Sequence, residues 1–172
     1  MNIPQSILQT VSDNANPLDN HYFSHAESSI NALNKVTGDL YCYDYMSNMI
    51  NALERVYKGF LLAATKECDW YQLPTSDYIG KDHDILKLLQ EIKSNFPSVF
   101  PREDRDAWRN TKSFLNDLRR EYSLARYDSY PTYDEFSKVR DYVNNQYDIV
   151  KDYIEQGRFV EDNKDSEYEI DY

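Results

Sequence analysis

The chain has 172 residues and a hydrophobic content of 41%, which is enough for one domain to bury a core without disulfides or a metal. Its net charge of −11 argues against non-specific attraction to nucleic acid or to an anionic membrane. Only 4 glycines are present, which disfavours β-sandwiches, barrels and glycine-rich phosphate loops. These properties predict a single all-α domain.

The cysteines and the lengths of the apolar runs predict the cellular compartment of the protein. Cys42 and Cys68 lie far apart, in or beside apolar helical stretches, which favours free thiols over a disulfide. The first residues lack a basic region, and no apolar run approaches the ~18 residues of a membrane-spanning helix. We therefore expect a cytoplasmic protein with no membrane partner.

The first third of the chain predicts an arm and two helices. Residues 1–18 are polar and contain two prolines, so we expect a flexible N-terminal arm. A first helix is expected from Asp19 or Asn20 to Val36, where a glycine follows soon after. The second helix has the clearest pattern, because apolar residues recur every three or four positions after a cap at Asp39. We expect it to be the central core helix.

Two further helices are separated by a pair of prolines. The third helix is expected to start near Asp82 and to end before Pro97. Pro101 and the acidic residues after it are typical of a helix start, because proline suits the first turn and acids suit the positive end of the helix dipole. The fourth helix should therefore begin at Pro101 and end around Arg126 and Tyr127.

The remaining residues predict a fifth helix and a tail. The helix should begin near Thr132 or Asp134 and end at Gly157. Residues 158–172 are acidic and are expected to form a disordered tail. Residues 19–157 would then form one antiparallel, up-and-down bundle of about five helices.

Three segments together carry a resemblance to a known family. Residues 51–61 read NALERVYKGFL and look like the core-helix pattern A-x-E-K-A-x-K-A-x-L. Residues 82–89 read DHDILKLL and are similar to a helix start T-H-D-L-x-x-L-L. Residues 122–128 read YSLARYD and look like Y-x-x-x-R-Y-P with Asp in place of Pro. In this order they resemble the HEPN family, over roughly residues 39–156.

HEPN proteins are small helical bundles found in bacterial toxin–antitoxin pairs and beside nucleotidyltransferase domains. Many are ribonucleases in which Arg is followed four to six residues later by His, so that Arg holds the phosphate and His moves the proton. Here no histidine follows His83, and Arg55 is followed by apolar residues where the histidine would stand. The resemblance therefore implies a non-catalytic binding module. An atypical ribonuclease that uses His83 and Arg126 is the alternative.

The resemblance also implies a ligand site and partners. Arg126 and Tyr127 stand where the family's groove would lie, and His83 and Lys58 complete the ligand-binding candidates. A nucleotide or RNA ligand and a nucleotidyltransferase or antitoxin partner are implied, with no cofactor. An apolar helix face predicts a homodimer. Two structural alternatives stay open: His83 satisfies backbone groups at a helix start, and Lys58 lies along the edge of the core helix.

The fourth helix has its charges sorted by face when it is drawn at about 100° per residue. The acidic and the basic side chains lie on different faces. The basic side chains are Arg102, Arg105, Arg109, Lys112, Arg119 and Arg126. We call the first five of these the basic stripe. It would receive a nucleotide phosphate, an RNA backbone or an acidic partner. The alternative is that it pairs with acidic helices of the same fold.

Two histidines offer a metal-binding alternative. His21 and His25 are spaced i, i+4 on the first predicted helix, which would let them share a divalent metal with Glu27 or His83. No cluster of further ligands stands nearby in the sequence, so a solvated helix face is the favoured interpretation. A metal-dependent helical bundle remains the third functional alternative, and no metal site is assigned.

Overall fold

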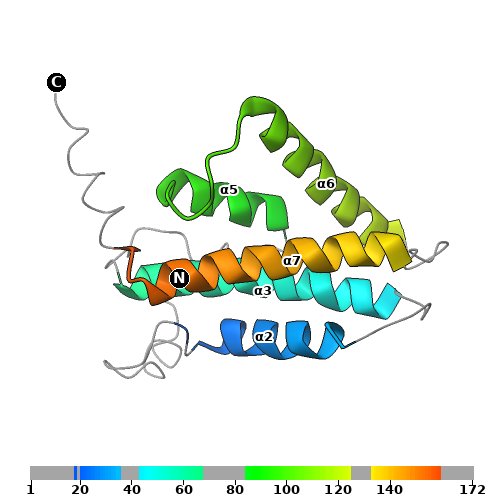
Figure 1. Ribbon diagram of the computed structural model, residues 1–172, viewed down its shortest axis with the longest axis horizontal. Coiled ribbons are helices and arrows are strands. Elements are labelled where there is room, and N and C mark those ends of the chain that lie inside the picture. Colours follow the sequence, from blue (N-terminus) through cyan, green and yellow to red (C-terminus); the bar gives the residue numbers. More distant parts are fainter. Residues whose placement is uncertain (1–17, 19, 36–42, 68–83, 125–132, 160–172) are drawn as a thin grey trace, which may run out of the picture.

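A computed structural model describes residues 18, 20–35, 43–67, 84–124 and 133–159. These ranges contain the helices α2 (His21–Leu33), α3 (Tyr43–Glu67), α5 (Ile85–Asn95), α6 (Arg105–Leu124) and α7 (Tyr133–Glu155) (Figure 1). No strand occurs within them. The prediction of an all-α fold with five helices is confirmed. Cys42, Cys68 and Asp39 lie outside the described residues.

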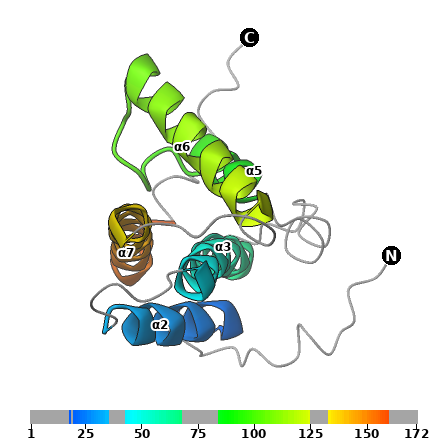
Figure 2. The same ribbon diagram turned by 90° about the vertical axis from the view of Figure 1, so that its right-hand side faces the viewer.

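The helices are arranged in three layers. In Figures 1 and 2, α3 and α7 lie side by side in the middle, α2 covers one of their faces, and α5 and α6 cover the other. None of the described helices has both the length and the apolar content that crossing a bilayer requires.

The two central helices run in the same direction. Tyr57 of α3 donates a hydrogen bond to the side-chain oxygen of Gln146 on α7 at 2.7 Å, and further along both helices the rings of Phe60 and Tyr153 pack 5.6 Å apart. The directions of neighbouring helices therefore do not alternate strictly, unlike the predicted up-and-down order. Periodicity could not reveal this, because it identifies the buried face of a helix and not its direction.

Helix α2 runs opposite to α7. Asn34, just after the end of α2, donates to Asn144 of α7 at 2.9 Å, while Glu27, earlier in α2, lies 3.7 Å from the ammonium of Lys151. The close approach of α2 to α3 depends on Gly59. The side-chain amide of Asn20 donates to the Gly59 carbonyl at 3.3 Å, and a Cβ at Gly59 would lie 3.0 Å from the Phe23 ring. Any side chain there would meet that ring.

Side-chain oxygens set the starts of three helices. Asn20 accepts from the Phe23 amide at 3.1 Å, Asp84 from the Lys87 amide at 3.3 Å, and Asp104 from the Ala107 amide at 2.8 Å. Such caps satisfy amides that have no partner inside the helix. The cap at Asp104 means that α6 begins at Arg105, so the predicted start at Pro101 is wrong.

Residues before that cap are therefore not helical. Arg102, the first member of the basic stripe, belongs to the connection between α5 and α6 and not to the face of α6. The remaining members of the stripe are residues of α6. The predicted and observed starts differ because a capping carboxylate competes with proline as a start signal, and here the carboxylate comes later in the chain.

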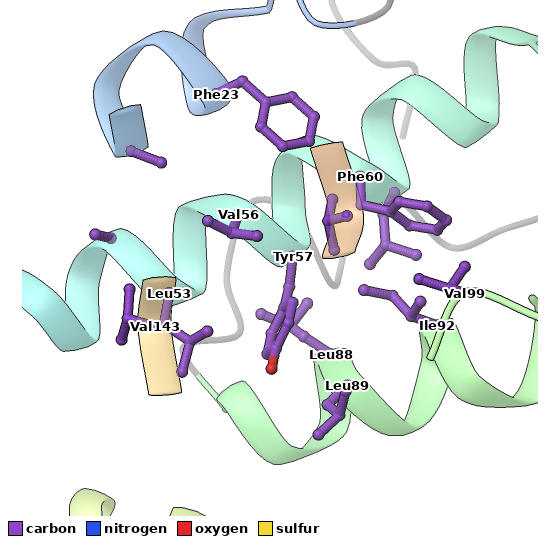
Figure 3. Close-up of a cluster of buried hydrophobic side chains, with 14 of the residues drawn as sticks. Phe23, Leu53, Val56, Tyr57, Phe60, Leu88, Leu89, Ile92, Val99 and Val143 are labelled. Atoms are coloured by element: carbon purple, nitrogen blue, oxygen red, sulfur yellow. The ribbon is translucent and has the colours of Figure 1, made fainter. Parts of the chain in front are cut away.

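The core is centred on an aromatic cluster. The Phe60 ring lies 5.2 Å from that of Phe96 and 5.3 Å from that of Phe159. Figure 3 shows Phe60 on α3 facing Ile92 and Val99, with Tyr57 one turn earlier facing Leu88 and Leu89. Burial of these side chains joins the middle layer to α5.

The packed region continues beyond the predicted boundary at Gly157. Gly157 adopts a φ of 65°, a left-handed conformation that glycine reaches at little cost and that commonly follows a helix. It turns the chain back, so that Phe159 is only 2% exposed. Arg158 and Phe159 therefore belong to the bundle, whereas the sequence predicts that the tail begins at residue 158. The residues after Phe159 lie outside the described ranges.

Candidate functional site

Lys58 is buried and paired. Its side chain is 5% exposed, and its ammonium lies 2.6 Å from the carboxylate of Glu54, one turn earlier on α3. A side chain that is buried and already paired differs both from a cation open to a ligand and from a lysine along the exposed edge of the core helix. The other three predicted ligand-binding residues, His83, Arg126 and Tyr127, lie outside the described residues.

His21 and His25 are exposed near the start of α2. Partial burial lowers the pKa of His21, and the nearby charge of His25 lowers it further. Among the described side chains, no group of three or more His, Cys, Asp or Glu is placed to hold a metal ion. The two histidines therefore have no third protein ligand in this part of the chain.

Buried residues anchor the connection between α5 and α6 to the core. Phe96 caps the end of α5, and Val99 and Phe100 are also buried. The rings of Phe100 and Tyr57 pack in a T-shaped arrangement at a centroid distance of 6.4 Å. These anchors fix the backbone from which Pro101 and the residues up to the α6 cap extend.

A cleft opens above this connection. Its volume is about 820 Å³, and its walls come from the end of α5, the connection and the first turn of α6. The lining residues that carry charge or an aromatic ring are Lys93, Phe100, Arg102, Glu103, Asp104, Arg105 and Trp108. Most ligand sites are concave and combine apolar walls with a few convergent polar groups, and this cleft has both.

Lys93 and Glu103 form an ion pair inside the cleft. The Lys93 ammonium lies 2.5 Å from Oε2 of Glu103, and their side chains are 24% and 28% exposed. The Thr111 hydroxyl donates to the other carboxylate oxygen, Oε1, at 2.9 Å. Glu103 therefore links the last turn of α5 to α6, and both of its oxygens have a donor.

Trp108 lies between two lysines. The ammonium groups of Lys93 and Lys112 are each 4.9 Å from the centre of the indole, and Lys93 is also 5.5 Å from the Phe100 ring. The negative face of an aromatic ring attracts a cation at such distances. Trp108 therefore holds positive charge at the rim of the cleft.

The described members of the basic stripe differ in their surroundings. Arg102, Arg105 and Arg109 are exposed. Arg109 lies 3.3 Å from Asp106 in an exposed pair, which contributes little to stability. Neither Arg102 nor Arg105 forms an ion pair with a carboxylate of the described ranges. Arg119 is a residue of α6 whose side chain lies outside the described set.

A buried polar cluster lies behind the cleft. Burial raises the pKa of Tyr57 well above its ordinary value, and Tyr142 and Glu103 raise it further. Burial also raises the pKa of Tyr142 to about 12, and the charge of Glu103 adds to this, while the hydrogen bond with Tyr57 opposes it. Both hydroxyls are therefore neutral near pH 7, so they act as hydrogen-bonding groups and not as proton-transfer groups there.

This cluster predicts an alkaline loss of stability. Because the pKa of Tyr142 is raised to about 12, its neutral form stabilises the fold fully below about pH 10, the unfolded value. The contribution, on the order of 2–3 kcal/mol, is lost as pH rises from about 10 to 12. Urea unfolding of the Tyr142→Phe variant should therefore depend less on pH in this window than unfolding of the parent chain. A constant difference between the two proteins across it would contradict the assignment.

A second cleft lies on the other side of the connection. Its volume is about 340 Å³, and it shares Phe100 and Pro101 with the first cleft. Arg158 lines it, donates to the Ser98 carbonyl at 3.3 Å, and has its guanidinium 5.0 Å from the centre of the Tyr153 ring. That cation is therefore already engaged by the fold.

The sequence pointed to only part of this site. Of the basic stripe, Arg102 and Arg105 line the cleft, whereas Arg109 and Lys112 are not among its lining residues. Arg102 precedes α6 and so does not share the periodicity of that helix, and the stripe did not include Lys93, which belongs to α5. A basic residue in the last turn of α5 was the one available signal, and it is a common feature of helix ends.

No family model matches the chain, and no curated protein or solved structure compared with it shows significant similarity.

Proposed function

We propose that this chain is a non-catalytic binding module that holds a phosphate-bearing ligand, a nucleotide or a stretch of RNA backbone, in the cleft between α5 and α6. The observation that carries the proposal is the position of Arg102 and Arg105. Both line the cleft, both are exposed, and neither pairs with a carboxylate of the described ranges. Guanidinium groups suit phosphate oxygens, because their planar donors match two of them at once.

The charge of the whole chain makes this placement notable. The chain has a net charge of −11, whereas the cleft is lined by three cations, Lys93, Arg102 and Arg105, and two carboxylates, so it is more positive than the chain as a whole. The chemistry near the cleft favours binding over catalysis. The buried hydroxyls of Tyr57 and Tyr142 stay neutral near pH 7, because burial raises the pKa of both. A general acid or base would need a pKa near the working pH.

The relation to the HEPN family is part of the same proposal. The five-helix all-α fold agrees with it, and the motif segments at residues 51–61, 82–89 and 122–128 supply the resemblance. With that family come the proposals of a homodimer and of a nucleotidyltransferase or antitoxin partner. Light scattering of the purified chain tests the dimer directly, since a mass of one chain at micromolar concentration would contradict it.

The binding proposal predicts a loss of affinity on removal of the two arginines. The Arg102→Gln/Arg105→Gln variant should bind AMP, ATP and a short oligouridylate at least tenfold more weakly than the parent chain at low salt. Each hydrogen bond to a charged group contributes about 1.5–3 kcal/mol, and about 1.4 kcal/mol corresponds to a factor of ten. Isothermal titration calorimetry measures the affinities.

A matched control separates the cleft from overall charge. The Lys35→Gln/Lys138→Gln variant removes the same charge from exposed positions at the end of α2 and on α7, and neither residue lines the cleft. Its affinities should stay close to those of the parent chain. If both double variants lose affinity equally, attraction is non-specific and the cleft is not the site. If the parent chain binds none of the three probes, the proposed function is wrong.

A further inference from the structure

Glu103 places a negative charge inside a cleft proposed to receive an anion. Its two oxygens are held by the Lys93 ammonium at 2.5 Å and the Thr111 hydroxyl at 2.9 Å. The Glu103 side chain is 28% exposed, so it lies partly in the cleft and partly against its wall. Its charge also raises the pKa of Tyr57 and Tyr142 behind the wall, so its field extends through this part of the molecule.

The two carboxylates that line the cleft have different roles. Asp104 accepts hydrogen bonds from the amides of Asp106 and Ala107 at 3.0 and 2.8 Å, so it is needed to start α6. Glu103 caps no helix. Its strongest contact is with Lys93, which is the cation held between the Phe100 and Trp108 rings. Of the two carboxylates, Glu103 is therefore the one that changes how much positive charge a ligand in the cleft meets.

We infer that Glu103 sets the affinity and the charge preference of the cleft by neutralising Lys93. With Lys93 paired, Arg102 and Arg105 are left to bind the ligand, so the cleft suits a phosphate group of low charge, such as a monophosphate or a phosphodiester, better than a triphosphate. The inference rests on the proposed function, because it concerns the same cleft. Glu103 is a positioning residue here, since it acts on the ligand through Lys93.

The sign of the expected effect separates this role from a merely structural one. Loss of the ion pair in Glu103→Gln should lower the melting temperature, because the contact between α5 and α6 is weakened. The same change removes one negative charge from the cleft, so that its net charge rises by one, and it frees the Lys93 ammonium from its ion pair. ATP should therefore bind roughly fivefold to tenfold more tightly, and AMP should gain less because it carries less charge. A residue that only supported the fold would weaken binding when replaced.

Two further variants and one control complete the test. Lys93→Gln leaves Glu103 without its partner and should weaken ATP binding by a similar factor. The Lys93→Gln/Glu103→Gln protein removes one charge of each sign and should return to within about threefold of the parent affinity. The control is Glu27→Gln, because Glu27 also pairs with a lysine, Lys151 at 3.7 Å, and accepts from a hydroxyl, that of Tyr147 at 2.9 Å, but does not line the cleft.

Calorimetric titration of the full chain with ATP and with AMP at low salt gives the result. Tighter ATP binding in Glu103→Gln, with Glu27→Gln unchanged, is the expected outcome. Weaker binding in Glu103→Gln overturns the inference, while loss of binding in Arg102→Gln/Arg105→Gln still upholds the proposed function. If Glu103→Gln does not fold, Lys93→Gln decides, because unchanged ATP binding there also overturns the inference. Absence of binding in every protein overturns both proposals.

Discussion

Replacing Phe159 with alanine is expected to lower the free energy of unfolding by about 3–5 kcal/mol, the usual cost of deleting a buried phenylalanine ring. The ring is 2% exposed and lies 5.3 Å from Phe60, 5.9 Å from Phe96 and 5.3 Å from Tyr153, measured between ring centres. Its removal leaves a cavity in the aromatic cluster that joins α3, α5 and α7. Urea denaturation followed by circular dichroism measures the loss.

Two shortened chains provide the comparison. A chain that ends at Phe159 keeps the ring, and a chain that ends at Gly157 lacks it together with Arg158. The second should be less stable than the first by about the same 3–5 kcal/mol. Equal stability of the two shortened chains would mean that the ring does not pack as described. This comparison removes residues 160–172 from both proteins, so their effect cancels.

Replacing Gly59 with leucine is expected to destabilise the fold by at least about 1–3 kcal/mol, the range for overpacking a close contact. A Cβ at this position would already lie 3.0, 3.1 and 3.2 Å from three atoms of the Phe23 ring, and leucine adds three more carbons. The ring cannot yield freely, because Phe23 is 3% exposed. Helix α2 would therefore have to move away from α3, and with it the hydrogen bond from Asn20 to the Gly59 carbonyl would break.

The control for this change is leucine at an open position of the same helix. Asn48 of α3 is exposed, so Asn48→Leu adds the same side chain without a steric conflict, and the higher helix propensity of leucine should leave stability unchanged or slightly improved. Gly59→Ala should fall between the two, because alanine favours the helix by about 1 kcal/mol and still meets the Phe23 ring. A Gly59→Leu protein as stable as Asn48→Leu would contradict the close packing of α2.

The number and approximate positions of the helices followed from the sequence, because apolar spacing reflects which side of each helix is buried. In the first helix the apolar residues Phe23, Ala26, Ile30 and Leu33 recur every three or four positions, and they are the buried face of α2. Helix ends were less predictable. Pro101 and Asp104 are both start signals, and only the geometry of the backbone shows that the carboxylate of Asp104 caps the helix.

The basic stripe shares only Arg102 and Arg105 with the residues that line the cleft. Periodicity places Arg105, Arg109 and Lys112 on one face of α6, because that information is local. The pairing of Lys93 with Glu103 joins two helices through their connection, and no spacing rule reports which helices become neighbours. The family resemblance makes Lys58 a ligand candidate, with a place along the edge of the core helix as its alternative. Its burial and its pairing with Glu54 depend on the surrounding layers, which the pattern of one helix does not contain.

The anchoring of the α5–α6 connection has a consequence for binding. Phe100 is at once a wall of the cleft and a buried neighbour of Tyr57, so the wall cannot shift without disturbing the core. A binding site built on such a wall is preorganised. A ligand in the proposed site would not have to order the backbone of a loop. It would still fix the exposed side chains of Arg102 and Arg105, at a cost of about 0.5–1.5 kcal/mol for each.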